Sequence, residues 1–365
     1  MKRIILTVTT DLVYDQRMQR ICSSLQKAGY RVLLVGRKKV DSKPLSEESY
    51  SQKRLYCFFQ KGKWFYLEYN IRLFFFLLFR KADILNAIDL DTILAVRLAA
   101  KFKSCQLVYD AHEYFTEVPE VVDRPRIQAL WERIARYCIP AMDACYTVGP
   151  GLARIFEEKY QQSFGVVRNL PLADAPHEKR PENQERILFY QGALNAGRGL
   201  ESIISAMSLL PASFTLWLAG EGDLSNVLRK QVLDAGLQER IRFLGFVLPR
   251  ELKALTPTVW LGLNLLENKG LSYYFSLANK AVDYVQAGVP SLQMDFPEYR
   301  ALQEEQPCFI LLKNLDPEQI AAEIIRLDRE KSRYEQLQQT CHRAAHIWTW
   351  EQEEKKLLAI YDKLN

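Results

Sequence analysis

Two glycine-containing turns in the C-terminal half carry residues suited to binding phosphate. Gly192 follows an apolar run and lies six residues before Arg198. A glycine lets the backbone approach a phosphate group, and a guanidinium donates paired hydrogen bonds to its oxygens. Gly220 and Gly222 follow the next apolar run and precede a helical pattern. Both turns also have an explanation without a ligand, because tight strand-to-helix turns use glycine for steric reasons and Asp223 suits a helix N-cap.

A third segment, residues 276–290, is the most specific of the three. Ser276 and Asn279 stand at the expected start of a helix, where free backbone N–H groups and the positive end of the helix dipole attract anions. Asp283 follows inside that helix. A carboxylate there can accept hydrogen bonds from a ribose while the helix N-terminus holds the phosphates. The alternative is a solvated aspartate without a ligand.

His112 is the candidate for chemistry in the N-terminal half. It follows an apolar run that ends at Asp110, which places it at the carboxyl edge of a sheet. A side chain that titrates near neutral pH suits acid–base catalysis. A structural histidine bonded to a neighbouring carbonyl is the alternative. Candidates for a binding pocket at the same strand ends, each also explicable as a surface or cap residue, are Asp11, Arg17, Asp89 and Glu113.

Alternating apolar runs and helical patterns must position these residues, and they recur in both halves of the chain. Such alternation indicates parallel sheets covered on both faces, so the expected fold class is α/β with two Rossmann-like, doubly wound domains facing across a cleft. Expected strands cover residues 4–9, 31–36, 83–88, 106–110, 144–148, 166–168, 187–191, 214–219, 241–243, 259–265 and 290–294. Expected helices cover residues 17–28, 92–101, 127–137, 200–209, 224–235, 280–287 and 350–364, and Gly29 suits the end of the first.

A change of composition divides the chain. Residues 170–186 hold three prolines and many charges without apolar periodicity, as a linker does. The expected division is an N-terminal domain over 1–170, a linker over 171–186 and a C-terminal domain over 187–349, with a final helix in 350–365.

Composition excludes several classes of protein. With 365 residues, 48% hydrophobic and 25% charged, the chain is long and apolar enough to bury two cores. The net charge of +5 is spread along the chain without a recognisable module, so we expect no nucleic-acid partner. Seven scattered cysteines without a CxxC pair argue against disulfides and zinc, and we expect no metal. The first apolar run is too short for a signal peptide, which favours a cytoplasmic protein.

The motifs together resemble retaining glycosyltransferase family 4. In the C-terminal half the resemblance rests on NAGRGLESIISA, LAGEGDL, RIRFLGFV and SLANKAVDYVQAGVP, in that order and spacing. In the N-terminal half it rests on YDQRMQRICSSLQKAGYRVLLVG, DLDTILAVRLAAK, LVYDAHEYF and VVRNLP. The resemblance covers nearly the whole chain. It implies the GT-B fold, transfer of a sugar with retention from a nucleotide diphosphate donor, no bound metal and no cofactor besides that co-substrate.

The resemblance also implies roles for individual residues. The donor would lie on the C-terminal domain and a glycan, lipid-linked or small-molecule acceptor on the N-terminal one, with the final helix crossing back to the first domain. Arg198 falls where the family binds the donor diphosphate, and Asp283 falls on the second carboxylate of its Glu-x7-Glu motif, expected on the ribose. His112 matches a histidine near the transferred sugar. Donor contacts are further expected from Gly192, Gly220, Gly222, Phe246, Val247, Ser276, Leu277, Ala278, Asn279 and Lys280, with Phe246 and Val247 packing the nucleobase.

The sequence departs from the family pattern at several positions. Phe275 stands at the first carboxylate of Glu-x7-Glu, Ala193 stands where a basic residue is usual, and residues 9–12 replace a glycine-rich loop. These departures leave room for an altered donor preference. They also keep two alternatives open, a non-catalytic nucleotide-sugar-binding subunit and a nucleotide-sugar epimerase of the same fold.

Residues 64–81 contain a strongly apolar, aromatic run. Glu68, Asn70 and Arg72 interrupt it, and residues 64–79 are too few to span a bilayer. One interpretation is a half-buried helix of the α/β domain. The other is an interfacial helix with Arg72, Arg80 and Lys81 at the headgroups, which would hold the protein at the inner face of the cell membrane near a lipid-linked acceptor.

Overall fold

The computed structural model describes residues 1–13, 15–173 and 185–364, which form two compact units. The first unit comprises Met1–Asn169, Gly270–Ser272 and Glu351–Asn365. The second comprises Leu170–Lys269 and Tyr273–Trp350. Most of the linker expected at 171–186, namely residues 174–184, lies outside the described part of the chain.

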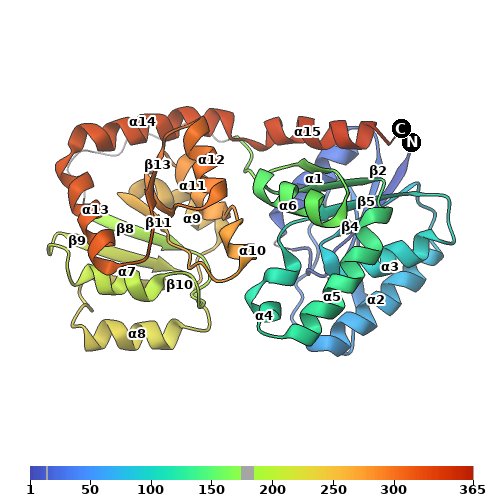
Figure 1. The fold of residues 1–365 in the computed structure, drawn as a ribbon, viewed down its shortest axis with the longest axis horizontal. Coiled ribbons are helices and arrows are strands. Elements are labelled where there is room, and N and C mark those ends of the chain that lie inside the picture. The colour runs from blue at the N-terminus through green and yellow to red at the C-terminus, as the bar shows by residue number, and fades with distance from the viewer. Residues whose placement is uncertain (14, 174–184, 365) are drawn as a thin grey trace. The chain divides into compact units, whose positions relative to one another are not determined.

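The first unit is built on a seven-stranded sheet in the order β3-β2-β1-β4-β5-β6-β7, and every neighbouring pair is parallel (Figure 1). Its central strand β4 has all five residues buried, as a parallel sheet covered on both faces requires. The strands are β1 Arg3–Thr7, β2 Arg31–Lys38, β3 Ser51–Tyr56, β4 Ile84–Ile88, β5 Gln106–Ala111, β6 Ala144–Thr147 and β7 Phe164–Val166.

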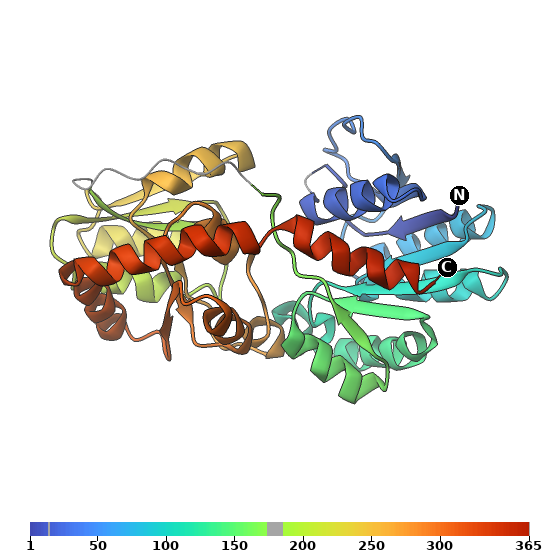
Figure 2. The same ribbon diagram turned by 90° about the horizontal axis from the view of Figure 1, so that it is seen from above.

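Helices cover both faces of this sheet. On one face α2 packs on α3 and α3 packs on α5. The C-terminal helix α15 lies over the strands with α1 nearby (Figure 2), where the hydroxyl of Tyr361 accepts a 2.6 Å hydrogen bond from Asn86 Nδ2 of β4. The helices are α1 Gln16–Lys27, α2 Gly62–Leu78, α3 Leu90–Ala100, α4 Pro119–Val122, α5 Pro125–Cys138, α6 Pro150–Tyr160 and α15 Trp350–Asp362.

The second unit repeats the plan with a six-stranded parallel sheet in the order β10-β9-β8-β11-β12-β13. Its strands are β8 Arg186–Gln191, β9 Phe214–Ala219, β10 Ile241–Gly245, β11 Leu261–Asn264, β12 Ser291–Met294 and β13 Phe309–Leu312. Its helices are α7 Leu200–Met207, α8 Ser225–Asp234, α9 Pro249–Leu255, α10 Leu271–Tyr274, α11 Asn279–Gln286, α12 Pro297–Glu305, α13 Pro317–Arg329 and α14 Lys331–Ile347.

The expected α/β class with two parallel sheets is confirmed. The structure adds strands β3 and β13, which the apolar pattern did not indicate, and places β7 two residues earlier than expected. Gly29 follows α1 with a φ of 91°, as a helix end of this kind requires. Within the described part of the chain, every helix is too short or too polar to span a bilayer.

Candidate functional site

Three glycine turns meet at the carboxyl edge of the second sheet, after β8, β9 and β10. Gly220 has a φ of 147°, and a Cβ atom there would lie 1.9 Å from the carbonyl oxygen of Gly192. A Cβ atom on Gly222 would lie 2.2 Å from Asn195 Oδ1. The glycines at 220 and 222 therefore have a steric reason, the close packing of neighbouring turns, whether or not a ligand binds. Asp223 does not cap the next helix, since the N-cap position of α8 is Leu224 and no side-chain hydrogen bond caps that helix among the described residues.

Two basic side chains, Arg198 and Lys280, lie beside these turns. The Arg198 guanidinium lies over the Tyr273 ring, 5.0 Å from its centroid, and its buried Nε has no hydrogen-bond partner among the described residues. Lys280, only 8% exposed, holds Nζ 3.7 Å from the centroid of the Tyr190 ring. A Cβ atom on Gly192 would lie 3.3 Å from that Nζ. Among the described residues, neither side chain forms an ion pair, so an added anion here could pair with both.

The environment of Lys280 disfavours its charged form. Burial and then the positive charge of Arg198 lower its pKa far below the usual lysine value, and the carboxylate of Asp283 only partly opposes them. An anion bound between the two cations would reverse this shift, because an opposite charge nearby favours the ammonium.

Some of the polar groups at the start of α11 already form hydrogen bonds within the second unit. The Ala278 N–H donates to the hydroxyl of Tyr299 at 3.1 Å, and the Ser276 hydroxyl donates to the Tyr273 carbonyl at 2.9 Å. Leu277 packs against the core of the unit, whereas Asn279 is exposed at the first position of the helix. Of the predicted phosphate-binding segment, Asn279 is therefore the residue best presented to solvent.

Asp283 is held by a side chain that sequence reasoning did not single out. Gln191 Nε2 donates to Asp283 Oδ2 at 2.8 Å, and Gln191 Oε1 accepts a hydrogen bond from the hydroxyl of Thr256 at 3.1 Å. Asp283 stays partly exposed, so it is oriented without being sealed in. After β10, Phe246 is 73% exposed and Val247 is half-buried against the core, as expected of an open platform for a base.

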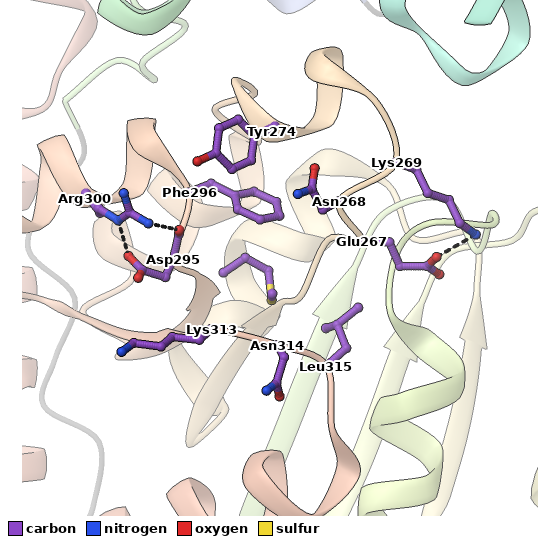
Figure 3. A pocket seen from close by; sticks show the side chains of 11 residues that line it. Glu267, Asn268, Lys269, Tyr274, Asp295, Phe296, Arg300, Lys313, Asn314 and Leu315 are labelled. Carbon is purple, nitrogen blue, oxygen red and sulfur yellow. Dashed lines mark hydrogen bonds and ion pairs between the residues drawn. The ribbon is translucent and has the colours of Figure 1, made fainter.

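A cavity of about 840 Å³ adjoins the Arg198 loop at the carboxyl ends of β11, β12 and β13 (Figure 3). Two residues that line the cavity contact the loop that carries Arg198. Glu267 N donates to the Gly197 carbonyl, and Leu315 lies 3.2 Å from where a Cβ atom on Gly199 would stand. Ion pairs join Arg300 to Asp295 and Lys269 to Glu267, while Lys313 forms none with the described residues. The lining also includes Asn268, Tyr274, Met294, Phe296 and Asn314, and sequence reasoning gave no role to any lining residue.

In the first unit, His112 lies between two carboxylates at the carboxyl edge of the sheet. Its Nε2 lies 2.9 Å from Asp110 Oδ2, and its Nδ1 lies 3.6 Å from Asp89 Oδ2. Asp89 has a φ of 56°, which is strained for this residue type, and its Oδ1 accepts the His112 N–H at 2.8 Å. Burial opposes a charged imidazole, but Asp110 and Asp89 outweigh it and raise the pKa of His112. The side chain is 22% exposed, so part of the imidazole ring is accessible from solvent.

Arg17 is a buried side chain that contacts the His112 cluster through Asp110. It is 5% exposed, donates to the Val167 carbonyl at 3.1 Å and pairs with Asp110 Oδ1 at 3.0 Å. Burial alone would raise the pKa of Asp110, but Arg17 and His112 outweigh burial and lower it. Arg17 therefore keeps Asp110 ionised from a position with little exposed surface.

The other predicted acceptor residues have separate surroundings. Asp11 pairs with Arg54 of β3 at 2.6 Å, and Glu113 is exposed beyond β5. The structure adds Asp91, which accepts a 2.5 Å hydrogen bond from the Thr9 hydroxyl. Burial and the charge of Asp89 raise the pKa of Asp91 to about 7. The paired acids of Asp89-Leu90-Asp91 at a strand end were the signal for this residue.

Comparison with solved structures identifies the architecture. Sucrose-phosphate synthase from Thermosynechococcus elongatus superposes with a TM-score of 0.80 at 13% identity, over 100% of this chain and 99% of that one. HepE from Anabaena, in complex with UDP-glucose, superposes with a TM-score of 0.79 at 13% identity, over 100% of both chains. The fold is GT-B. WaaG, a glycosyltransferase involved in lipopolysaccharide biosynthesis, shares it with a TM-score of 0.73 and 16% identity, over 98% of this chain and 99% of that one.

The sequence comparison places a family match within the second GT-B unit. Residues 185–329 match the family described as "Glycosyl transferases group 1". No curated protein matches the chain. Among the described residues, no cluster of three or more His, Cys, Asp or Glu side chains is placed to hold a metal ion.

Proposed function

We propose that the protein is a retaining, metal-independent glycosyltransferase that takes a sugar from a nucleoside diphosphate donor. The observation that carries the proposal is the pair of cations without counterions, Arg198 and Lys280, beside the turn at Gly192. Two neighbouring like charges repel each other, and a bound diphosphate removes both this repulsion and the missing hydrogen bonds. The match of residues 185–329 to group 1 glycosyltransferases supports the proposal, as does HepE, whose structure contains UDP-glucose.

In this reaction the bond between the sugar C1 and the diphosphate oxygen breaks, and C1 bonds to the acceptor hydroxyl oxygen on the same face. The hydroxyl proton passes to the departing diphosphate. Arg198 and Lys280 stabilise the charge that develops on the leaving group, which is where fixed cations contribute most. Asn279 adds a polar contact at the helix start, Gln191 orients Asp283 for the ribose, and Phe246 with Val247 packs the base.

His112 acts as a fixed positive charge in this scheme and not as a general base. The carboxylates of Asp110 and Asp89 on either side favour the charged imidazole and raise its pKa. In that charged form the ring has no free lone pair with which to remove a proton. We propose that it stabilises negative charge near the transferred sugar, with Asp11, Asp89 and Glu113 as candidates for binding the acceptor.

The cavity beside the Arg198 loop is proposed to take the sugar of the donor. Asn268 and Asn314 offer amide groups, Lys313 offers an ammonium without an ion-pair partner among the described residues, and Tyr274 offers an aromatic face. These are the groups that bind sugar hydroxyls and the apolar faces of sugar rings. A glycan or lipid-linked acceptor in the cytoplasm is the matching second substrate. The seven free cysteines fit the reducing conditions there.

The test combines binding and turnover. A thermal-shift screen with nucleoside diphosphates is expected to raise the unfolding temperature with one base, because a ligand that binds only the native state stabilises it. Arg198→Met is expected to abolish that shift, whereas Arg250→Met, at an exposed arginine on α9, retains it. The protein is then incubated with a panel of nucleotide sugars.

The outcomes separate the candidate functions. Transfer or slow hydrolysis of one donor supports the glycosyltransferase. Binding without turnover, unchanged in His112→Ala, supports the non-catalytic subunit that Phe275 and Ala193 keep open, and conversion of one nucleotide sugar into an epimer supports the epimerase. If no nucleoside diphosphate shifts the transition, the donor site is wrongly assigned.

A further inference from the structure

Helix α2 is apolar both on the face that it buries and on the face that it exposes to solvent. Phe65, Tyr69, Leu73 and Leu77 are buried in the first unit. On the opposite side, a stripe formed by Trp64, Leu67, Ile71, Phe75 and Phe79 is exposed, from 48% at Ile71 to 81% at Phe79. A helix on the surface of a globular unit normally presents polar residues to water. The outer face of α2 is therefore suited to a non-aqueous neighbour.

This stripe continues onto two further segments. Phe102, 70% exposed in the loop after α3, contacts the ring of Phe74 of α2, and Lys103 Nζ donates to the Arg80 carbonyl at 2.6 Å. Lys101 lies 5.4 Å from the centroid of the Tyr137 ring, which is half exposed on α5. Ile127 and Leu130 of α5 are exposed as well. We call residues 58–81, 101–103 and 126–137 together the α2–α5 surface.

The α2–α5 surface is strongly basic. Its three segments hold ten Lys and Arg residues and two Glu residues. Both glutamates are already neutralised. Glu68 accepts the N–H groups of Phe58 and Phe59 and pairs with Arg72, while Glu132 pairs with Arg136 and Lys159. Arg72 and Arg136 pair with these glutamates, and the other eight basic residues of the α2–α5 surface form no ion pair with the described residues.

We propose that the α2–α5 surface binds the anionic surface of a lipid bilayer, with the α2 stripe among the acyl chains near the headgroups and the basic side chains on the phosphates. Apolar residues on one helix face with cations at its margins are typical of helices that lie in a membrane interface. A second copy of this chain fits poorly, because a two-fold interface would bring this basic surface against itself. The proposal does not depend on the transfer reaction.

The test is flotation of the full-length protein with vesicles of phosphatidylcholine alone and of phosphatidylcholine with phosphatidylglycerol. The protein is expected to float with the anionic vesicles, less so at high salt. The variant L67S/F75S is expected to bind roughly 100-fold more weakly, about tenfold for each apolar side chain. The variant R126Q/R133Q is expected to lose about fivefold for each charge, on anionic vesicles only.

Matched control variants lie on α8 of the second unit, where Val227 and Leu233 are as exposed as the stripe residues. V227S/L233S is expected to bind vesicles like the wild type. All variants are first required to keep the wild-type unfolding temperature and any shift with nucleoside diphosphate, so that loss of vesicle binding is not loss of fold or of the donor site. Wild-type protein that does not float, or L67S/F75S that floats equally well, overturns the proposal. A wild-type dimer that L67S/F75S converts to a monomer would instead assign the surface to a second copy of the chain.

Discussion

Replacing Lys280 by methionine is expected to weaken binding of a nucleoside diphosphate while leaving the free protein at least as stable. A hydrogen bond between a charged pair contributes about 1.5–3 kcal/mol, so the dissociation constant should rise about 10- to 150-fold. In the free protein the Lys280 amine is buried beside Arg198, which disfavours its charged form, and it forms no ion pair with the described residues. Methionine therefore removes a buried polar group whose charged form the site opposes.

The aromatic contact does not reverse this balance. The cation over the Tyr190 ring contributes about 0.5–2 kcal/mol, but methionine fills similar space and its sulfur gains about 0.3–1.5 kcal/mol against the same ring. The free energy of unfolding should thus be unchanged or higher by about 1 kcal/mol, which corresponds to about 2–4 °C for a unit of this size. Lys230→Met, at an exposed lysine on α8, is the control.

The pH dependence follows from the direction of the Lys280 pKa shift. Because the folded pKa lies below the unfolded value, the unfolded state binds more protons between the two values, and stability rises with pH across that window. The methionine variant should lack this rise. A bound diphosphate restores the ammonium, so binding should take up a proton and weaken as pH increases, which calorimetry in buffers of different ionisation enthalpy measures. Unchanged affinity in Lys280→Met, or a large loss of stability, would refute the reasoning.

Three further predictions concern stability in urea denaturation. The free energy of unfolding of the wild type should fall by up to about 4 kcal/mol between pH 4 and pH 7, because the folded pKa of Asp91 is raised from 3.8 to about 7. In Asp91→Asn the free energy of unfolding should depend less on pH, and an equal dependence would contradict the raised pKa of Asp91. Gly220→Ala should destabilise the protein by more than about 2 kcal/mol, since its Cβ atom would lie 1.9 Å from a backbone oxygen. Gly236→Ala, which has open space around its Cβ atom, should lose only about 1 kcal/mol from its positive φ. Equal losses would show that the positive φ, and not the steric clash, causes the destabilisation. Tyr361→Phe should lower the free energy of unfolding by about 1–2 kcal/mol, because it removes the buried hydrogen bond from Asn86. An unchanged urea midpoint would contradict the packing of α15 against β4.

Apolar pattern predicted most of the strands because a buried parallel strand is apolar along its whole length. β4 is the clearest case, with every residue buried. β3, with the sequence SQKRLY, escaped because it is an edge strand with several residues exposed, so its composition resembles a loop. The glycine turns were found for the same local reason, since a strand followed by glycine and a helix is visible within ten residues of sequence.

The partners of the site residues had no such signal. Gln191 and Asp283 are 92 positions apart, and Arg17 and Asp110 are 93 apart, so only the folded sheets bring them together. The sequence indicated His112 as a group that titrates near neutral pH, but not that carboxylates on two strand ends would raise its pKa. Local pattern thus predicts which residues reach the edge of a sheet, whereas tertiary pairing decides their charge and orientation.

The departures from the family pattern at Ala193 and Phe275 should affect binding of the donor's diphosphate less than binding of its sugar. The basic residue missing at Ala193 has a substitute, because Lys280 projects from α11 to within 3.3 Å of where a side chain on Gly192 would begin. The proposed diphosphate site thus keeps two basic side chains. Phe275 has no comparable substitute, since its ring packs edge-on against Tyr274 with centroids 5.0 Å apart and brings no carboxylate toward the sugar. Because phosphate binding depends on charge and sugar selection on placed hydrogen bonds, this chain should retain a nucleotide while choosing its sugar differently from relatives with two acidic residues.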